Sequence, residues 1–298
     1  MKHPNHACCI ALIVLACAGC GDQAKTLDAN AEIAAGTEQC LRYNFDLAAG
    51  NFTRARAASA PGSAEYAQAT LGLAVAIHHK VPLNAKRINE QAVPLYEEAF
   101  AKGGTSLVAA RAALSRGRAA EERDEKDDPV DLDTARTWYQ KVIDGWAGEA
   151  IAGEATLRLA ESYIQTLKPD DVRKGVTLAE ARATSHPTQP WSGSLWQQAG
   201  DACWIILHDR DNAIRCLVKA EQAGLPDPAR GWITIWRVAT LAEDAGQKDL
   251  AIEHYRNIVI KFPSSGKAWE AQERLRALGV EPPTIRPPLD LGTMEDKP

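Results

Sequence analysis

The sequence predicts an all-α protein, an α-solenoid of about six helix-turn-helix pairs with a C-terminal capping helix. One apolar pattern recurs along the chain every 37 to 43 residues, which is the interval typical of stacked helix pairs. Within each copy the apolar residues follow helical spacing, and no segment alternates as a strand does. Because one hairpin of this size buries little apolar surface alone, successive pairs must stack on each other.

The N-terminus has the layout of a secretory signal, with Lys2 followed by an apolar run over residues 7–16. The run is shorter than the roughly 20 apolar residues that span a bilayer. Residues 15–22 resemble the lipobox of bacterial lipoproteins, which implies cleavage before Cys20 and lipid modification of Cys20. Cys17 departs from that pattern, since an aliphatic residue is typical there. The alternative is an ordinary cleaved signal whose cysteines are incidental.

The lipobox resemblance divides the first part of the chain into a signal peptide, 1–19, and a lipid-anchored linker, 20–35. Two or more acyl chains hold a protein stably on a membrane. The resemblance therefore implies a cell-envelope protein that is anchored in the membrane by lipid and faces the periplasm. Gly21, rather than aspartate, directly after Cys20 favours the outer membrane over the inner one.

The clearest copy of the repeat spans residues 231–263, where Gly246 separates two helical stripes and Pro263 ends the second. The stripes consist of Trp236, Ala239, Leu241, Ala242, Ala251, Tyr255 and Ile258. Small residues at the helix crossing, an aromatic filler, a turn glycine and a closing proline resemble a tetratricopeptide repeat.

The second-helix signature of this copy returns elsewhere. Its starts are Ala55, Ala92, Ala135, Gly175, Ala213 and Ala251, of which Ala55 and Gly175 are the weaker copies. The intervals exceed the 34 residues of a strict tetratricopeptide repeat and approach those of Sel1-like pairs. We expect the solenoid over 36–280, with residues 267–278 as its cap. The prolines and charges of 281–298 cannot pack a core and predict a disordered tail.

Eight tryptophans are present, and the repeat divides those on first helices into two groups. Trp196, Trp232 and Trp269 recur 36 and 37 residues apart near the start of first helices, where the family packs an aromatic residue in the core. The resemblance places other first-helix positions on the concave, ligand-facing surface. These partner-binding candidates are Trp204, Trp236, Glu161, Gln165, Asp201, Thr240 and Glu243.

Charge and motifs argue against nucleic-acid binding and against catalysis. Acidic residues outnumber basic ones by 39 to 34, whereas nucleic-acid binding needs a basic face. Serine-nucleophile, phosphate-loop and zinc-protease motifs are missing, so we expect no enzyme, no cofactor and no metal. The acidic run 121–128 lacks the glycine and closing glutamate of an EF-hand and predicts a solvated insertion. His78 and His79 are adjacent, so we expect their side chains to diverge on a helix, which argues against a pair of metal ligands.

Three cysteines remain after the predicted cleavage and lipidation: Cys40, Cys203 and Cys216. Their number and spacing fit neither a disulfide framework nor a zinc site. Cys203 and Cys216 lie on the two helices of one predicted pair and could face each other as a disulfide. The alternative is two small apolar residues packed between helices.

These features together predict a membrane-tethered scaffold that binds a partner protein or peptide on its concave face. The alternative function is a glycan-associated lipoprotein in polysaccharide export or cell-wall handling. In that alternative Trp204 and Trp236 are the platforms on which sugar rings stack.

Overall fold

The computed structural model describes residues 27–123 and 130–284. The predicted signal peptide, the lipidation site Cys20, part of the acidic run and the tail from residue 285 lie outside the described residues. Throughout the described residues the regular structure is helical, and no strand occurs among them. The predicted all-α class and solenoid architecture are confirmed.

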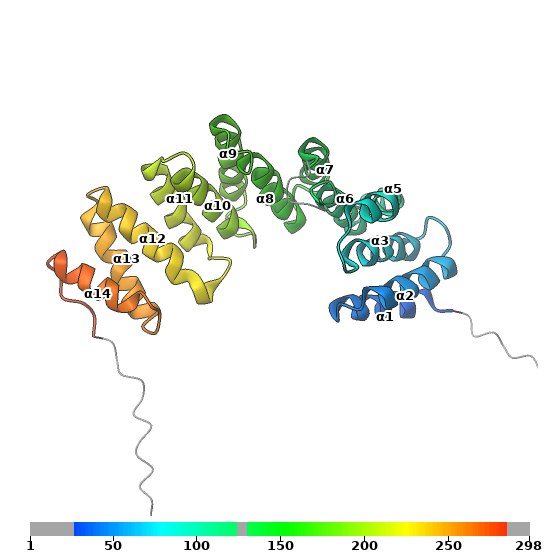
Figure 1. Ribbon diagram of the computed structural model, residues 1–298, viewed down its shortest axis with the longest axis horizontal. Helices are drawn as coiled ribbons and strands as arrows, with labels where there is room; N and C mark the ends of the chain where they lie inside the picture. Colours follow the sequence, from blue (N-terminus) through cyan, green and yellow to red (C-terminus); the bar gives the residue numbers. More distant parts are fainter. Residues whose placement is uncertain (1–26, 124–129, 285–298) are drawn as a thin grey trace, which may run out of the picture.

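The described residues form six stacked helix pairs in an open arch (Figure 1). The pairs are α1 (Ala29–Leu41) with α2 (Phe45–Ala58), α3 (Ala64–His79) with α5 (Val93–Gly103), α6 (Leu107–Ala119) with α7 (Leu132–Gly145), α8 (Ala150–Ile164) with α9 (Pro169–Ser185), α10 (Ser192–Ile205) with α11 (Arg210–Ala223), and α12 (Gly231–Asp244) with α13 (Lys248–Lys261). Helix α14 (Ala268–Ala277) caps the last pair. Short turns at Ala85–Arg87 (α4), Ile88–Ala92 and Pro228–Arg230 complete the helical segments.

The first helix begins at Ala29, inside the stretch 20–35 that the sequence assigned to a linker. Asp28 caps it, because its side chain accepts a hydrogen bond from the backbone N–H of Asn30 at 2.9 Å. At the other end, α14 lies within the segment 267–278 that was predicted as the cap.

Small residues lie where the two helices of a pair cross. The alanines that begin the predicted second-helix signatures are fully buried: Ala55, Ala92, Ala135, Ala213 and Ala251. At Gly175 of α9 even a Cβ atom would lie 2.7 Å from the carbonyl oxygen of Ala160 in α8. Larger side chains at these positions would force the helices apart.

Three pairs contain a fully buried tyrosine four residues after that alanine, namely Tyr96, Tyr139 and Tyr255. The hydroxyl of Tyr139 donates to Glu121 at 2.8 Å, and that of Tyr255 donates to Glu243 at 2.6 Å. The Tyr96 hydroxyl lies 3.0 Å from a ring nitrogen of a buried histidine in α3. The ring thus fills the pair while its polar end is satisfied by a side chain in the first helix or in the turn that follows it.

In the first pairs a phenylalanine ring fits between two glycines. Phe52 of α2 is 3% exposed and lies between α1 and α3. A Cβ atom would lie 2.9 Å from the ring atom Cε1 if built on Gly36, and 2.5 Å from Cδ1 if built on Gly72. The ring therefore occupies the space that side chains on both neighbouring helices would need.

The tryptophans predicted for the core differ in their burial. Trp196 is 5% exposed, as predicted, and Trp232 is half-buried. The prediction for Trp269 is wrong, because its side chain is 70% exposed. Trp269 belongs to the capping helix α14, which has no further pair stacked on it among the described residues, so the surface that covers an internal aromatic is missing there.

Charged side chains join the fifth pair to the sixth. Glu221 of α11 lies 3.2 Å from the Nε2 atom of His254 and 3.2 Å from the Nζ atom of Lys261, both on α13. The Nδ1 atom of His254 lies 3.0 Å from the carbonyl oxygen of Leu250. Burial works against charging this imidazole, but the hydrogen bonds to Glu221 and Leu250 outweigh it and raise the pKa of His254.

Within the described residues the extensive contacts of each pair are with its sequence neighbours, so the row stays open and its ends lie apart (Figure 1). In the central pairs the first helices lie towards the inner side of the arch, and α7, α9 and α11 lie towards the outside (Figure 1). None of the helices in the described part of the chain combines the length and apolarity that crossing a membrane requires.

Candidate functional site

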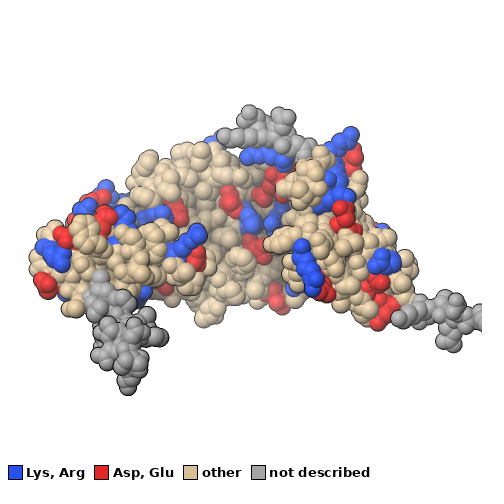
Figure 2. All heavy atoms as spheres, turned by 60° about the horizontal axis from the view of Figure 1, so that its bottom comes forward, with Lys and Arg blue, Asp and Glu red and all other residues tan. Residues whose placement is uncertain are grey.

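The concave face contains a groove between α8 and α10, with a volume of about 490 Å³. Its apolar lining comes from Leu157, Ile164, Ala202, Ile205, Ile206 and Pro226. Glu161 and Asp201 line the same groove, together with Arg158 and the amides of Gln197 and Gln198. Figure 2 turns the lower side of the arch towards the reader and shows acidic and basic side chains gathered in the central hollow.

A carboxylate lies at or near the C-terminal end of each of four successive first helices. These residues are Glu121, Glu161, Asp201 and Glu243, which are 40, 40 and 42 residues apart. Each is held by a neighbour: Glu121 by the hydroxyl of Tyr139, Glu161 by Arg158, Asp201 by Arg237, and Glu243 by the hydroxyl of Tyr255. Glu121 and Glu243 thus accept from the tyrosine of their own second helix, whereas Glu161 and Asp201 line the groove, and we call the four together the carboxylate row.

Two members of the carboxylate row are partly removed from water. Burial raises the pKa of Asp201, although the charge of Arg237 opposes this shift. Burial also raises the pKa of Glu121. The hydrogen bond from Tyr139 opposes this shift, and the charge of Glu161 adds to it. A partly desolvated carboxylate gains more than an exposed one from a donor that a ligand supplies.

Arg237, which the sequence reasoning did not single out, joins the sixth pair to this site. From α12 it forms an ion pair with Asp201 of α10. Its guanidinium carbon lies 4.6 Å from the ring centroid of Trp204, whose side chain is 38% exposed. The separation of Asp201 and Arg237 equals the 36-residue repeat interval between Trp196 and Trp232, and that interval is the signal that could have found the pair.

The structure brings together three of the seven predicted partner-binding residues. Glu161 and Asp201 line one groove, and Trp204 lies beside Asp201 through their shared contact with Arg237. Gln165 is exposed at the C-terminal cap of α8 and does not line the groove.

The other three predicted residues lie in the sixth pair. Trp236 is half-buried, its ring 5.3 Å from that of Tyr255 and 4.6 Å from the Nζ atom of Lys267. The carboxylate of Glu243 accepts the Tyr255 hydroxyl, and the hydroxyl of Thr240 donates to a backbone carbonyl of its own helix at 3.1 Å. Trp236 and Glu243 thus contribute to the packing of their own pair.

The expectation that the side chains of His78 and His79 diverge is wrong, because their rings stack with centroids 4.6 Å apart. Burial lowers the pKa of both. Nε2 of His78 lies 3.3 Å from Glu122, and its Nδ1 faces the Tyr96 hydroxyl. Among the residues that the structure describes, no three histidine, cysteine or acidic side chains are grouped so that they could hold a metal ion.

Comparison with known proteins bears on the fold. No protein-family model matches the chain, and no curated protein matches it. The structure of pilF from Pseudomonas aeruginosa, a tetratricopeptide-repeat protein, overlaps with a TM-score of 0.52 at 18% identity, over 83% of this chain and 97% of that one. BtubC from P. vanneervenii gives 0.48 at 14% identity, over 89% and 98%. The TPR2AB domain of yeast Sti1, in complex with pHSP90, gives 0.34 at 16% identity, over 84% and 98%.

Of these three, pilF is the structure whose overlap carries the fold assignment. The tetratricopeptide-like fold expected from the repeat is confirmed.

Proposed function

We propose that this chain is an interaction scaffold that binds an extended segment of a partner protein in its concave groove. The observation that carries the proposal is the groove between α8 and α10, where an apolar lining and two carboxylates of the carboxylate row share about 490 Å³. Solenoids of helix pairs use such concave surfaces to bind partners through many distributed contacts.

The groove offers complementary chemistry to a peptide. An apolar side chain fits against Leu157, Ile164 and Ile206, where it leaves water. Glu161 and Asp201 can accept hydrogen bonds from backbone N–H groups or from lysine and arginine side chains. Because both carboxylates are already held by arginines, they lose little conformational freedom when a partner binds.

The arrangement around the tryptophans favours a protein ligand over the glycan alternative. The ring of Trp204 has the guanidinium of Arg237 over it, and the ring of Trp236 has the ammonium of Lys267 at 4.6 Å. Sugar rings stack on open aromatic faces, and here a cation already lies over one face of each ring.

A groove variant and a matched surface variant test the binding site. Glu161→Lys with Ile205→Asp reverses one charge and places another on an apolar side chain that is 57% exposed in the groove. Glu253→Lys with Ile260→Asp makes the same changes on α13, where Ile260 is 63% exposed. Neither control residue lines the groove.

Both variants, after circular dichroism confirms that they fold, are crosslinked in cell envelopes and purified beside the wild type. We expect a partner protein that is retained by the wild type and by the α13 control and is lost from the groove variant. Equal recovery with both variants would show that the partner binds elsewhere. Recovery of glycan without protein would support the alternative function.

We further propose that Cys20 carries a lipid that tethers the scaffold to the bacterial outer membrane, facing the periplasm. The support is the charged and apolar N-terminus with its lipobox resemblance. Metabolic labelling with a clickable fatty acid should mark the wild type and leave Cys20→Ser unlabelled. Fractionation of the labelled cells then assigns the membrane, and label that persists in Cys20→Ser would refute the anchor.

A further inference from the structure

Two thiols lie in contact inside the fifth helix pair. Cys203 of α10 is 2% exposed and Cys216 of α11 is fully buried, and neither is in a disulfide. Their side chains are hydrogen-bonded to each other. The Cys216 sulfur also lies 3.2 Å from the Oε1 atom of Glu180, on α9, so its single proton is donated either to Glu180 or to Cys203. The buried pair is therefore linked to a carboxylate that can take up a proton.

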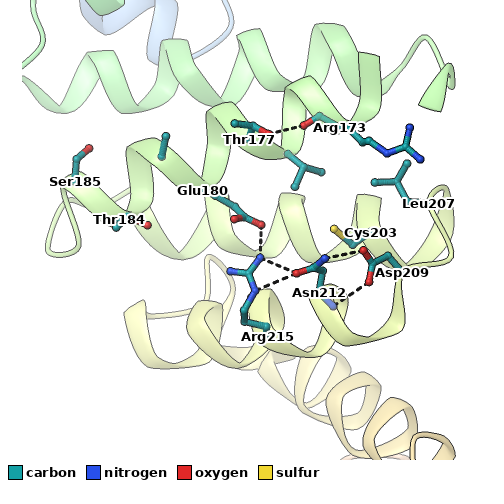
Figure 3. Close-up of a pocket in the computed structure, with 12 residues that line it drawn as sticks. Arg173, Thr177, Glu180, Thr184, Ser185, Cys203, Leu207, Asp209, Asn212 and Arg215 are labelled. Carbon is teal, nitrogen blue, oxygen red and sulfur yellow. Dashed lines mark hydrogen bonds and ion pairs between the residues drawn. The ribbon is translucent and has the colours of Figure 1, made fainter. Parts of the chain in front are cut away.

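A cavity on the other side of the array from the concave groove leads to one of the two thiols. It has a volume of about 700 Å³ and lies between α9, the C-terminal end of α10 and α11. Cys203 lines it, together with Leu207, Glu180 and Arg215, whereas Cys216 does not (Figure 3). A small molecule that enters the cavity thus meets the sulfur of Cys203 first.

The surroundings make the two sulfurs unequal. A hydrogen bond from Cys216 lowers the pKa of Cys203, with a smaller contribution from the charge of Arg215, against burial and the charges of Asp209 and Glu180. The same hydrogen bond, burial and Glu180 raise the pKa of Cys216. Since the thiolate is the nucleophile, Cys203 is the more reactive of the two and Cys216 keeps its proton.

We propose that Cys203 and Cys216 form a reactive dithiol that reduces hydrogen peroxide or a small organic hydroperoxide and closes to a disulfide. This site is independent of the concave groove. In the first step the Cys203 thiolate attacks one peroxide oxygen, the O–O bond breaks, and hydroxide or alkoxide leaves. Cys203 becomes a sulfenic acid.

In the second step the sulfur of Cys216 attacks the sulfur of the sulfenic acid. The S–S bond forms as the S–O bond breaks, and the proton of Cys216 passes to Glu180 and then to the departing hydroxide. Two thiols and one hydrogen peroxide thus give one disulfide and two waters. An external thiol restores the pair by exchange.

Peptide mapping of the full chain tests the proposal directly. Trypsin cuts after Arg182, Arg210, Arg215 and Lys219, so Cys203 lies in peptide 183–210 and Cys216 in 216–219. One equivalent of hydrogen peroxide on the folded protein should link these two peptides, with the loss of two hydrogens, and a reducing thiol should separate them. Cys40, which is half-buried on α1, serves as the internal control and should stay reduced.

The absence of the linked peptide after peroxide treatment of folded protein would overturn the proposal. So would its formation only in denaturant, because the fold is then not what brings the sulfurs together. Oxidation of Cys40 at the same rate as Cys203 would likewise overturn it, since the cavity would then confer no reactivity.

Two single variants assign the roles. Cys216→Ala should accumulate a sulfenic acid at Cys203 that dimedone traps, whereas Cys203→Ala should leave Cys216 unmodified. Glu180→Gln keeps the size of the side chain and removes the base, so disulfide closure should slow by about a hundredfold while the first step continues. Unchanged closure in Glu180→Gln would remove the carboxylate from the mechanism, and dimedone labelling of Cys216 in Cys203→Ala would reverse the assignment.

Discussion

Replacing Gly72 by alanine should destabilise the first helix pairs, although alanine is the better helix former. Gly72 lies within α3, and a Cβ atom there would lie 2.5 Å from the ring atom Cδ1 of Phe52. The ring cannot retreat towards α1, because a Cβ on Gly36 would lie 2.9 Å from the ring on that side, which places the Gly36 backbone close to it. The Phe52 side chain is also only 3% exposed, so the ring cannot move out into solvent to make room.

The magnitude follows from two opposing effects. Alanine in place of glycine inside a helix stabilises it by about 0.5 to 1 kcal/mol. An extra methyl group in a packed core costs about 1 to 3 kcal/mol. Gly50→Ala on α2 is the matched control, because a Cβ there would meet only the end of the Arg54 side chain, at 3.6 Å. Its helix gain is the same, so the difference between the two variants isolates the overpacking, about 1 to 3 kcal/mol.

Urea unfolding followed by circular dichroism measures both variants, and hydrogen exchange over α1 to α3 locates the effect. Gly72→Ala should unfold at lower urea than the wild type, and Gly50→Ala at equal or higher urea. In a Phe52→Ala background the cost of Gly72→Ala should disappear, since the two sites are in contact. If Gly72→Ala is as stable as Gly50→Ala, the close packing of Phe52 against α3 is refuted.

Three further perturbations follow from the same packing. The pKa of His254 is raised in the folded state, so its protonated imidazole stabilises the fold fully below the unfolded pKa of about 6.5, and this stabilisation is lost as pH rises through the folded pKa. The free energy of unfolding of the wild type, measured with urea, should therefore fall more steeply with rising pH than that of His254→Gln. Trp196→Ala should lower the unfolding free energy by about 3 to 5 kcal/mol and Trp269→Ser by less than about 0.5 kcal/mol, so equal midpoint shifts would contradict their burial. Tyr139→Phe removes a hydroxyl that donates to a carboxylate at 2.8 Å and should cost about 1.5 to 3 kcal/mol, and a stability equal to wild type in thermal unfolding would argue against that bond.

The helix pairs could be predicted from the sequence because their signals are local and repeat. Ala135 and Tyr139 stand four residues apart, as do Ala251 and Tyr255, and all four side chains are fully buried. The small residue lets the two helices approach, and the aromatic residue one turn later fills the space beside the crossing. The same logic failed for Trp269, because it assumes a following pair that covers the ring.

The candidate site was harder to predict, because it depends on contacts between pairs. The sequence placed Glu161 and Asp201 on one surface, and the structure puts both in one groove. Arg237 could not be predicted from one pair alone, because its partner Asp201 lies a whole repeat away and helical spacing within a pair does not indicate that contact. The cavity beside Cys203 likewise forms between helices of two different pairs, so no single motif encodes it.

An open row whose described pairs make their extensive contacts with sequence neighbours is expected to deform elastically along its length. A rotation too small to disturb the packing at any one interface is repeated at each of them, and the sum changes the distance between the two ends of the arch. The width of the hollow is therefore a property of the whole chain. A partner held at both ends would strain all the interfaces a little, and that elastic energy is returned when it leaves.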